Sequence, residues 1–483
     1  MKNLKKNFVY SLCYQVLIII APLITTPYIS RVLGADNIGI YSYSESILTY
    51  FKMFASLGLG TFGQRELSYY RDDIDKRTKI FWETKLLEFL TSTIVIAVYI
   101  VFAANQKNSA VFFMLIFGLL AGMVDITWFF YGMEEVGKTV GRNFVFKLIG
   151  IAYIFIFVKD ANGLLIYAFG NMFFMFLGNA SLWLFMPKYI KLPDLKNIHP
   201  MNNIKTSTAL FLPTIASQIF MSLDKTMLGA IADNSFENGY YEQATKVVRL
   251  TFTIINAFSV VMVPRIGYYF SNNKKDLMEE YTYKSYKFVW MISIPLCLGL
   301  IGIANNLVPW FFGESYEPVV GLLYILSFLI IFLGLNTISG VQYLVPTKRE
   351  NVYTGIIIAS MLSNMLLNAL LIGRYYSSGA AIASVVAEGI GTVLYFVYLR
   401  RELKICKIIS SSVKYWISGI AMLFVISILS NYFKASILNT AILVLVGMST
   451  YFIVLLLLHD SLVYEMLRYI EGKLKKYLIK TNE

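Results

Sequence analysis

Long apolar segments alternate with short polar connections along the whole chain. Each segment has about 20 or more mostly apolar residues, the length that a helix needs to cross the hydrocarbon core of a bilayer. The predicted spans are residues 8–33, 38–62, 80–103, 109–131, 142–158, 162–186, 206–231, 240–264, 286–308, 318–345, 353–373, 379–399, 414–432 and 437–458. This pattern predicts an all-α integral membrane protein with about fourteen transmembrane helices.

Composition supports this interpretation. Of the 483 residues, 57% are hydrophobic and only 15% are charged, and the charges gather between the apolar segments. The first apolar segment is too long for the core of a signal peptide and is followed by further spans, so we expect it to stay in the mature protein. The three cysteines lie far apart, which argues against a disulfide framework or a metal site.

The basic residues follow an alternating pattern that predicts the orientation. The net charge is +13, but the charge is not clustered on a soluble face, so we expect no nucleic-acid partner. Basic residues fill the N-terminus, every second connection and the C-terminal tail, whereas the other connections hold only Lys107, Lys159, Arg374 and Lys434. The positive-inside rule then predicts that both termini lie in the cytoplasm.

Two parts of the chain look like copies of one unit. Gly39-Ile40-Tyr41 opens a span that closes at Arg65, and Gly239-Tyr240-Tyr241 opens one that closes at Arg265, a constant offset of 200 residues. The two spans are six apart and therefore share one orientation, so a pseudo-twofold axis would run along the membrane normal. A chance match of so few letters is the alternative.

The repeat predicts two six-helix bundles, residues 1–200 and 201–405, facing each other across a central cleft. Residues 406–483 would add a C-terminal helix pair and a cytoplasmic tail. The outer connections are too short to hold an extracellular catalytic domain, which argues against an enzyme.

Charged residues inside spans are the main functional clue. A charge at the bilayer centre costs roughly 2.5–3.5 kcal/mol on insertion scales, so such groups should face protein or water. In span two, polar residues recur on one helical face; they are Glu45, Thr49, Lys52 and Ser56. The corresponding face of span eight carries Glu242, Lys246, Arg249, Thr253 and Asn256. The two stripes predict a shared polar interior, and the alternative is that they only pair internally to hold helices together.

One segment resembles a phosphate loop by its letters. Residues 132–139, GMEEVGKT, fit the pattern G-x-x-x-x-G-K-[ST]. The segment joins two membrane spans, whereas a phosphate loop needs a preceding buried strand in an α/β domain. We therefore expect no bound nucleotide and no cofactor, and transport would be driven by a proton or sodium gradient or by the gradient of the substrate.

Several motifs, in the same order along the chain, are similar to those of the Wzx-type polysaccharide flippases, a family of the multidrug/oligosaccharidyl-lipid/polysaccharide exporter superfamily. The matching stretches are PYISRVLG at 27–34 with GIY at 39–41, LGL at 57–59 with RE at 65–66, WFFYGME at 128–134, and LDKTMLG at 223–229 with GYY at 239–241.

The resemblance implies a flippase in the bacterial cytoplasmic membrane that moves undecaprenyl-diphosphate-linked oligosaccharide to the outer leaflet by alternating access. It also implies membrane lipid as a second partner, with polysaccharide polymerase and glycosyltransferases as further partners. Cations in a wet cavity would hold the diphosphate; the candidates are Arg31, Lys52, Lys225, Lys246 and Arg249. Acids that pair with these cations or carry coupling protons are Glu45, Asp125, Asp224 and Glu388. Related lipid II flippases use basic residues at positions that fall here at Arg31, Lys52 and Arg249, although lysine replaces arginine at 52.

Three alternatives remain open. A lipid II or multidrug exporter of the same superfamily would share the fold, although a drug exporter is expected to centre on acidic residues. A membrane-embedded polysaccharide polymerase would need a long outer loop with arginine or histidine. A structural membrane subunit would use the charged stripes for helix packing alone.

Overall fold

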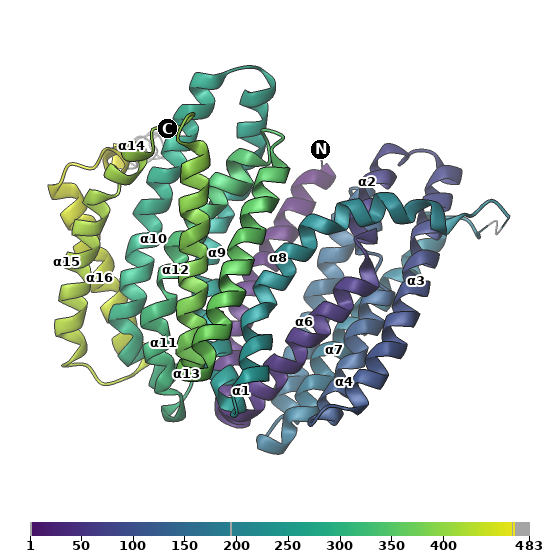
Figure 1. The fold of residues 1–483 in the computed structure, drawn as a ribbon, viewed down its shortest axis with the longest axis horizontal. Coiled ribbons are helices and arrows are strands. Elements are labelled where there is room, and N and C mark those ends of the chain that lie inside the picture. The colour runs from purple at the N-terminus through teal and green to yellow at the C-terminus, as the bar shows by residue number, and fades with distance from the viewer. Residues whose placement is uncertain (1, 194–195, 466, 469–483) are drawn as a thin grey trace, which may run out of the picture. The chain divides into compact units, whose positions relative to one another are not determined.

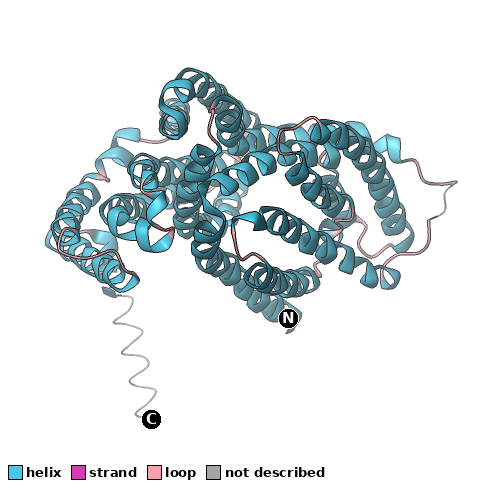
Figure 2. Ribbon diagram, turned by 90° about the horizontal axis from the view of Figure 1, so that it is seen from below, coloured by secondary structure: helices cyan, strands magenta, loops and turns pink. Residues whose placement is uncertain are grey.

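The computed structural model describes residues 2–193, 196–465 and 467–468. Every regular element among these residues is a helix, as Figure 2 shows. The chain forms two compact units that divide within one helix, between Glu242 and Gln243. This division reflects which residues pack together. It does not test the predicted bundle boundaries at residues 200 and 405, which stay predictions.

Unit 1 contains eight complete helices and the start of a ninth (Figure 1). They are α1 (Lys2–Ser56), α2 (Leu59–Tyr69), α3 (Ile74–Ala104), α4 (Ser109–Met123), α5 (Thr127–Gly132), α6 (Val136–Phe157), α7 (Leu164–Ser181), α8 (Ile204–Ile231) and α9 (Ser235–Ser271). Short 3-10 helices at Ala161–Gly163, Leu182–Lys188 and Pro200–Asn203 lie between them.

Unit 2 is built around the long helix α10 (Lys275–Phe311), which packs against most of its neighbours. The other helices are α11 (Pro318–Leu326), α12 (Phe328–Asn336), α13 (Glu350–Leu399), α14 (Ile405–Ser410), α15 (Val413–Ser430) and α16 (Ile437–Leu457). A π-helix, η5 (Thr337–Leu344), continues α12, and the 3-10 helix η4 (Glu314–Tyr316) precedes α11.

Eleven helical stretches of the described residues are long and apolar enough to cross a membrane. Two long helices in these stretches have a sharp internal break: α1 at Gly34, with φ 76° and ψ 169°, and α13 at Tyr376, with φ 47° and ψ −127°. With 55 residues, α1 would be about 80 Å long if straight, far more than one bilayer crossing needs. The break at Gly34 therefore separates two segments, and glycine adopts this positive φ without steric cost.

The break in α13 is of a different kind, because a tyrosine occupies it. A bulky residue at positive φ is a true outlier, and a strained conformation of this kind costs about 1–3 kcal/mol. Figure 1 shows α13 turning back on itself at the lower end of the view.

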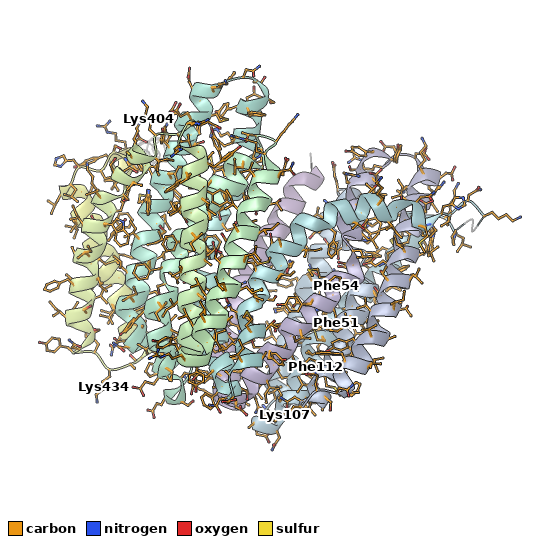
Figure 3. The ribbon with its side chains drawn as sticks, viewed as in Figure 1. Phe51, Phe54, Lys107, Phe112, Lys404 and Lys434 are labelled. Atoms are coloured by element: carbon orange, nitrogen blue, oxygen red, sulfur yellow. The ribbon has the colours of Figure 1, made fainter. Side chains whose placement is uncertain are left out.

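The core of unit 1 is an aromatic and aliphatic cluster between α1, α3, α4 and α7. Phe51 packs edge-on against Tyr99 at 4.9 Å between ring centroids, and the Tyr99 hydroxyl donates to the carbonyl of Phe112 at 3.0 Å. Figure 3 labels Phe51 and Phe112 in the interior of this unit. The ring contacts hold the second segment of α1 against α3 and α4.

A fully buried lysine fixes the junction between α4 and α5. The Lys85 ammonium, on α3, donates to the carbonyls of Met123 and Asp125, each at 2.9 Å, and pairs with Glu88 at 2.6 Å. Carbonyls at the end of a helix have no partner within the helix, so the ammonium satisfies them. Lys85 therefore has a structural role here, although it lies inside a predicted span.

The second segment of α1 crosses the start of α9 backbone to backbone. A Cβ atom on Gly39 would lie 1.7 Å from the carbonyl oxygen of Ser235, and one on Gly239 would lie 2.0 Å from that of Ala35. Gly239 follows Gly39 by 200 residues, and Ser235 follows Ala35 by the same number. The two contacts are therefore equivalent, with the roles of the two helices exchanged. The crossing thus has a local twofold arrangement, at the glycines that mark the predicted repeat.

We predict that Gly39→Ala and Gly239→Ala each destabilise the protein by about 1–3 kcal/mol or more, because the added methyl group forces the crossing apart. The measurement is the melting temperature of the purified protein in detergent. Gly141→Ala in α6 is the control, since a Cβ there meets no atom within 4 Å. Equal melting temperatures for all three variants would contradict the close crossing.

Candidate functional site

A polar cluster in unit 1 joins α1, α8 and the start of α9. The Lys225 ammonium forms an ion pair with the Glu242 carboxylate, and the two side chains are only 21% and 14% exposed. The Ser42 hydroxyl donates to the same carboxylate at 3.1 Å. Since Ser42 and Glu242 are also 200 residues apart, the local twofold arrangement continues one helical turn beyond the glycine crossing.

Tyrosines extend this cluster along α1. The Tyr41 hydroxyl donates to Glu45 at 3.4 Å, and its ring packs edge-on against Tyr167 of α7 at 4.9 Å. Asn171 lies beside both phenol hydroxyls. The carboxylates of Glu45 and Glu242 thus both interact electrostatically with Tyr41 and Tyr167.

Lys52 lies on the same face of α1 as Glu45, two turns further along. Its ammonium contacts the sulfur of Met172 at 3.9 Å, and its side-chain stem packs against Gly118. Glu45 acts on it electrostatically, but no ion pair of Lys52 is present among the described residues. A half-buried cation in a membrane-spanning helix whose only close partner is a thioether is poorly satisfied.

Asp224 precedes Lys225 on α8 and faces the start of α9. Its carboxylate accepts from the Tyr241 hydroxyl at 2.6 Å and is buried. Next to it, Thr226 shares hydrogen bonds with the hydroxyls of Tyr50 and Ser46, at 3.0 and 2.9 Å. The predicted residues Glu45, Lys52, Asp224 and Lys225 therefore belong to one polar region of unit 1.

The other predicted residues lie elsewhere. Arg31 is exposed on the first segment of α1. Asp125 lies at the α4–α5 junction, where its carboxylate accepts from the Thr127 amide at 2.8 Å and from the Thr127 hydroxyl. Lys246 and Arg249 follow the division in α9 and belong to unit 2. Their functional roles stay predictions.

Glu388 belongs to a second polar cluster, in unit 2. Its carboxylate accepts from the side-chain amide of Asn336 at 2.6 Å, and the Thr392 hydroxyl donates to the carbonyl of the same amide at 2.7 Å. Asn336 is the last residue of α12 before the π-helix η5. Such π-helical stretches are rare and occur frequently at functional sites.

Sequence reasoning did not select Tyr41, Tyr167, Asn171 or Glu242 as site residues. Glu242 lies on a predicted stripe, and its i, i+4 spacing to Lys246 predicts only a place on that stripe. Tyr167 and Asn171 lie in the otherwise apolar span of α7, and only their contact with α1 shows that they matter. An i, i+4 pair of polar residues in an apolar span is the signal that could have found them.

The phosphate-loop-like segment has a different role. Its second half is the first turn of α6, and Lys138 lies 4.2 Å from the ring centroid of Tyr189. Arg71 pairs with Glu134 of this segment at 2.8 Å. The lysine is held by aromatic rings, and no strand precedes it among the described residues. That the segment binds no nucleotide stays a prediction.

Known proteins share this fold along nearly the whole chain. A solved structure of the lipid II flippase MurJ, in an inward closed conformation, superposes with a TM-score of 0.76 at 15% identity, covering 94% of this chain and 100% of that one. At this identity the likeness shows the fold alone. Together with the eleven apolar stretches, it supports the predicted all-α membrane fold.

Two relatives are similar in sequence over most of their length. A putative O-antigen transporter from Escherichia coli strain K12 is 23% identical over 429 residues, 84% of this chain and 99% of that protein. A capsular polysaccharide biosynthesis protein from Staphylococcus aureus is 22% identical over 410 residues, 82% of this chain and 99% of that protein. These likenesses confirm the resemblance found in the sequence motifs and the multi-pass membrane character.

The family described as polysaccharide biosynthesis protein matches residues 4–270, just over half of the chain. This match includes the second segment of α1, α8 and the start of α9, which carry the polar cluster. The chain therefore belongs to the polysaccharide biosynthesis protein family.

Proposed function

We propose that the protein is a flippase that moves undecaprenyl-diphosphate-linked oligosaccharide repeat units across the cytoplasmic membrane for surface polysaccharide biosynthesis. Membership of the polysaccharide biosynthesis family supports this substrate class. The names of the relatives, an O-antigen transporter and a capsular polysaccharide biosynthesis protein, point the same way. They also favour a transporter over a polymerase.

The observation that carries the proposal is the state of Lys52. This half-buried cation has no ion-pair partner in the described structure, and it shares a polar region with the Lys225–Glu242 pair. A diphosphate offers strong acceptor oxygens that satisfy ammonium groups in a site of low dielectric constant. The lipid tail can stay in the bilayer while the head group passes through the polar interior.

We propose that the chain crosses the membrane fourteen times. The eleven apolar stretches include α1 and α13, each of which contains two segments, and α8, with 28 residues, would be the remaining span. The two six-helix bundles, residues 1–200 and 201–405, would be related by a pseudo-twofold axis along the membrane normal. The exchanged contacts of Gly39 and Gly239 support this axis.

Both termini would lie in the cytoplasm. Within unit 2, Lys404 and Lys434 lie at opposite ends in Figure 3. This agrees with the charge pattern, which predicts Lys404 on the inner side of the membrane and Lys434 on the outer side. The first would face the cytoplasm, and the turn of α13 would then lie on the outer side.

Coupling would come from a proton or sodium gradient acting on the acids. Glu388 is the best-placed acid in unit 2, because its carboxylate bonds to the residue at which α12 becomes a π-helix. Asp224 is the corresponding candidate in unit 1, where its carboxylate accepts from the Tyr241 hydroxyl of α9. The flippase would need no cofactor, and it would receive its substrate from glycosyltransferases and pass it to a polymerase.

We predict that Lys52→Ala lowers transport more than about tenfold, because loss of one charge-assisted contact to phosphate corresponds to about 1.5–3 kcal/mol. The measurement is surface polysaccharide in cells that carry only the variant, with the amount of membrane-inserted protein as reference. Lys107→Ala, at an exposed lysine labelled in Figure 3, is the matched control. Normal polysaccharide in the Lys52→Ala strain would rule out Lys52 as a substrate contact.

We predict that changes to the Lys225–Glu242 pair affect stability and transport differently. Lys225→Ala leaves a largely buried carboxylate without its partner and should destabilise the protein by about 3–5 kcal/mol. The exchanged pair, Lys225→Glu with Glu242→Lys, should recover much of the melting temperature but not transport, because the cation has moved to α9. Full recovery of transport by the exchanged pair would mean that the pair only holds helices together.

A further inference from the structure

The turn of α13 is strained at an exposed position. Tyr376 has φ 47° and ψ −127°, a region that favours glycine, and glycines are present close by at 373 and 379. A glycine at 376 would make the same turn without strain. The turn itself therefore does not require a tyrosine at this position. Strained residues of this kind cluster at sites that contact ligands.

The turn consists of an arginine followed by two tyrosines, Arg374, Tyr375 and Tyr376. Tyr375 is 48% exposed and Tyr376 is 40% exposed. The Arg374 guanidinium lies 5.6 Å from the ring centroid of Tyr375. Among the described residues, neither phenol hydroxyl has a hydrogen-bond partner and Arg374 has no carboxylate partner. The turn thus presents two exposed tyrosine side chains and a guanidinium that has no carboxylate partner among the described residues.

The positive charge of Arg374 is an exception to the positive-inside pattern of the chain. Arg374 is one of only four basic residues in the connections that the charge pattern places outside. A basic residue on that side weakens the positive-inside signal. Its presence beside two exposed rings is explained if the guanidinium binds an anion there.

We propose that Arg374, Tyr375 and Tyr376 form a contact site on the outer side for the saccharide part of the transported lipid, with preference for a saccharide that carries a carboxylate or phosphate group. The apolar face of a phenol ring fits the C–H face of a sugar ring, and its hydroxyl can bond to sugar hydroxyls. An arginine stacked on a ring still presents its N–H edge, which pairs bidentately with carboxylate or phosphate. This inference rests on the proposed function for the direction of transport and for the substrate class.

The site can be tested by binding to the purified full-length protein in lipid nanodiscs. The probe is a soluble hexuronate oligosaccharide, followed by saturation-transfer NMR, with a neutral oligosaccharide of the same length for comparison. Tyr376→Gly should bind the acidic probe about tenfold more weakly, because a ring contact is lost, while its melting temperature stays equal or rises as the strain is relieved. Arg374→Gln should bind both probes with similar affinity.

Tyr432→Ala is the matched control. Tyr432 is 80% exposed in the α15–α16 connection, which also holds Lys434, and it is not strained. This variant should bind the acidic probe as the wild type does. Equal binding by wild type and Tyr376→Gly would overturn the inference, and so would an equal loss in Tyr432→Ala. A lower melting temperature in Tyr376→Gly with unchanged binding would also overturn it, since the ring would then anchor the turn in the membrane interface.

A second measurement separates this inference from the proposed function. Vesicles that contain the wild-type protein are supplied with lipid-linked oligosaccharide, and the outward-exposed fraction is measured. No transport by the wild type, with acidic-probe binding that Tyr376→Gly weakens, would refute the flippase and leave the site. Transport by the wild type, with probe binding that Tyr376→Gly does not change, would refute the site alone.

Discussion

The high free energy of a charge in hydrocarbon governs the arrangement of this molecule. Each basic residue within a span needs a partner, and the partners differ in kind. Lys85 has two carbonyls and a carboxylate, Lys225 has one carboxylate, and Lys52 has a thioether as its close contact. A cation that is fully satisfied by its own protein gains little from a ligand, whereas a poorly satisfied one gains the full strength of a charge-assisted hydrogen bond. The ordering of these three lysines therefore separates structural cations from those able to bind a phosphate.

The glycine crossing brings the polar groups to one place. Because Gly39 and Gly239 have no side chain, the backbones of α1 and α9 approach closely, and residues one turn beyond, such as Ser42 and Glu242, come within hydrogen-bonding distance. A duplicated chain that contacts itself at equivalent positions repeats each contact with its roles exchanged, as at a twofold interface between subunits. A polar group placed near such an axis acts on both copies. The contact of Glu242 with Ser42, 200 residues away, is the kind of contact that such an axis would produce.

The sequence was sufficient for the membrane character, the family resemblance and four residues of the polar region, which are Glu45, Lys52, Asp224 and Lys225. These follow from signals that extend over many residues: the length of apolar segments, the position of lysines and arginines, and the helical spacing of Glu45 and Lys52. The difference between Lys85 and Lys52 could not be predicted, since both are lysines in apolar spans and only the fold brings the carbonyls of Met123 and Asp125 to one of them. The contact of Tyr41 with Tyr167 and Asn171 depends equally on how α1 packs against α7. The predicted spans 353–373 and 379–399 leave a connection around Tyr376, but the strain there has no sequence signal, because a positive φ is expected at glycine.

If Lys225 contacts the substrate as proposed, its ion pair with Glu242 would also limit how tightly a phosphate binds. A carboxylate already occupies the ammonium, so an incoming phosphate gains only the difference between its own interaction and the one it displaces. A transporter must release its substrate on the far side, and conduction requires binding that is favourable enough for entry but weak enough for exit. An internal anion meets this requirement, because it competes for the cation again as the substrate leaves. Lys52, with no competing carboxylate in contact, would then supply most of the affinity, and Lys225 would supply a charge that can be exchanged between Glu242 and the substrate.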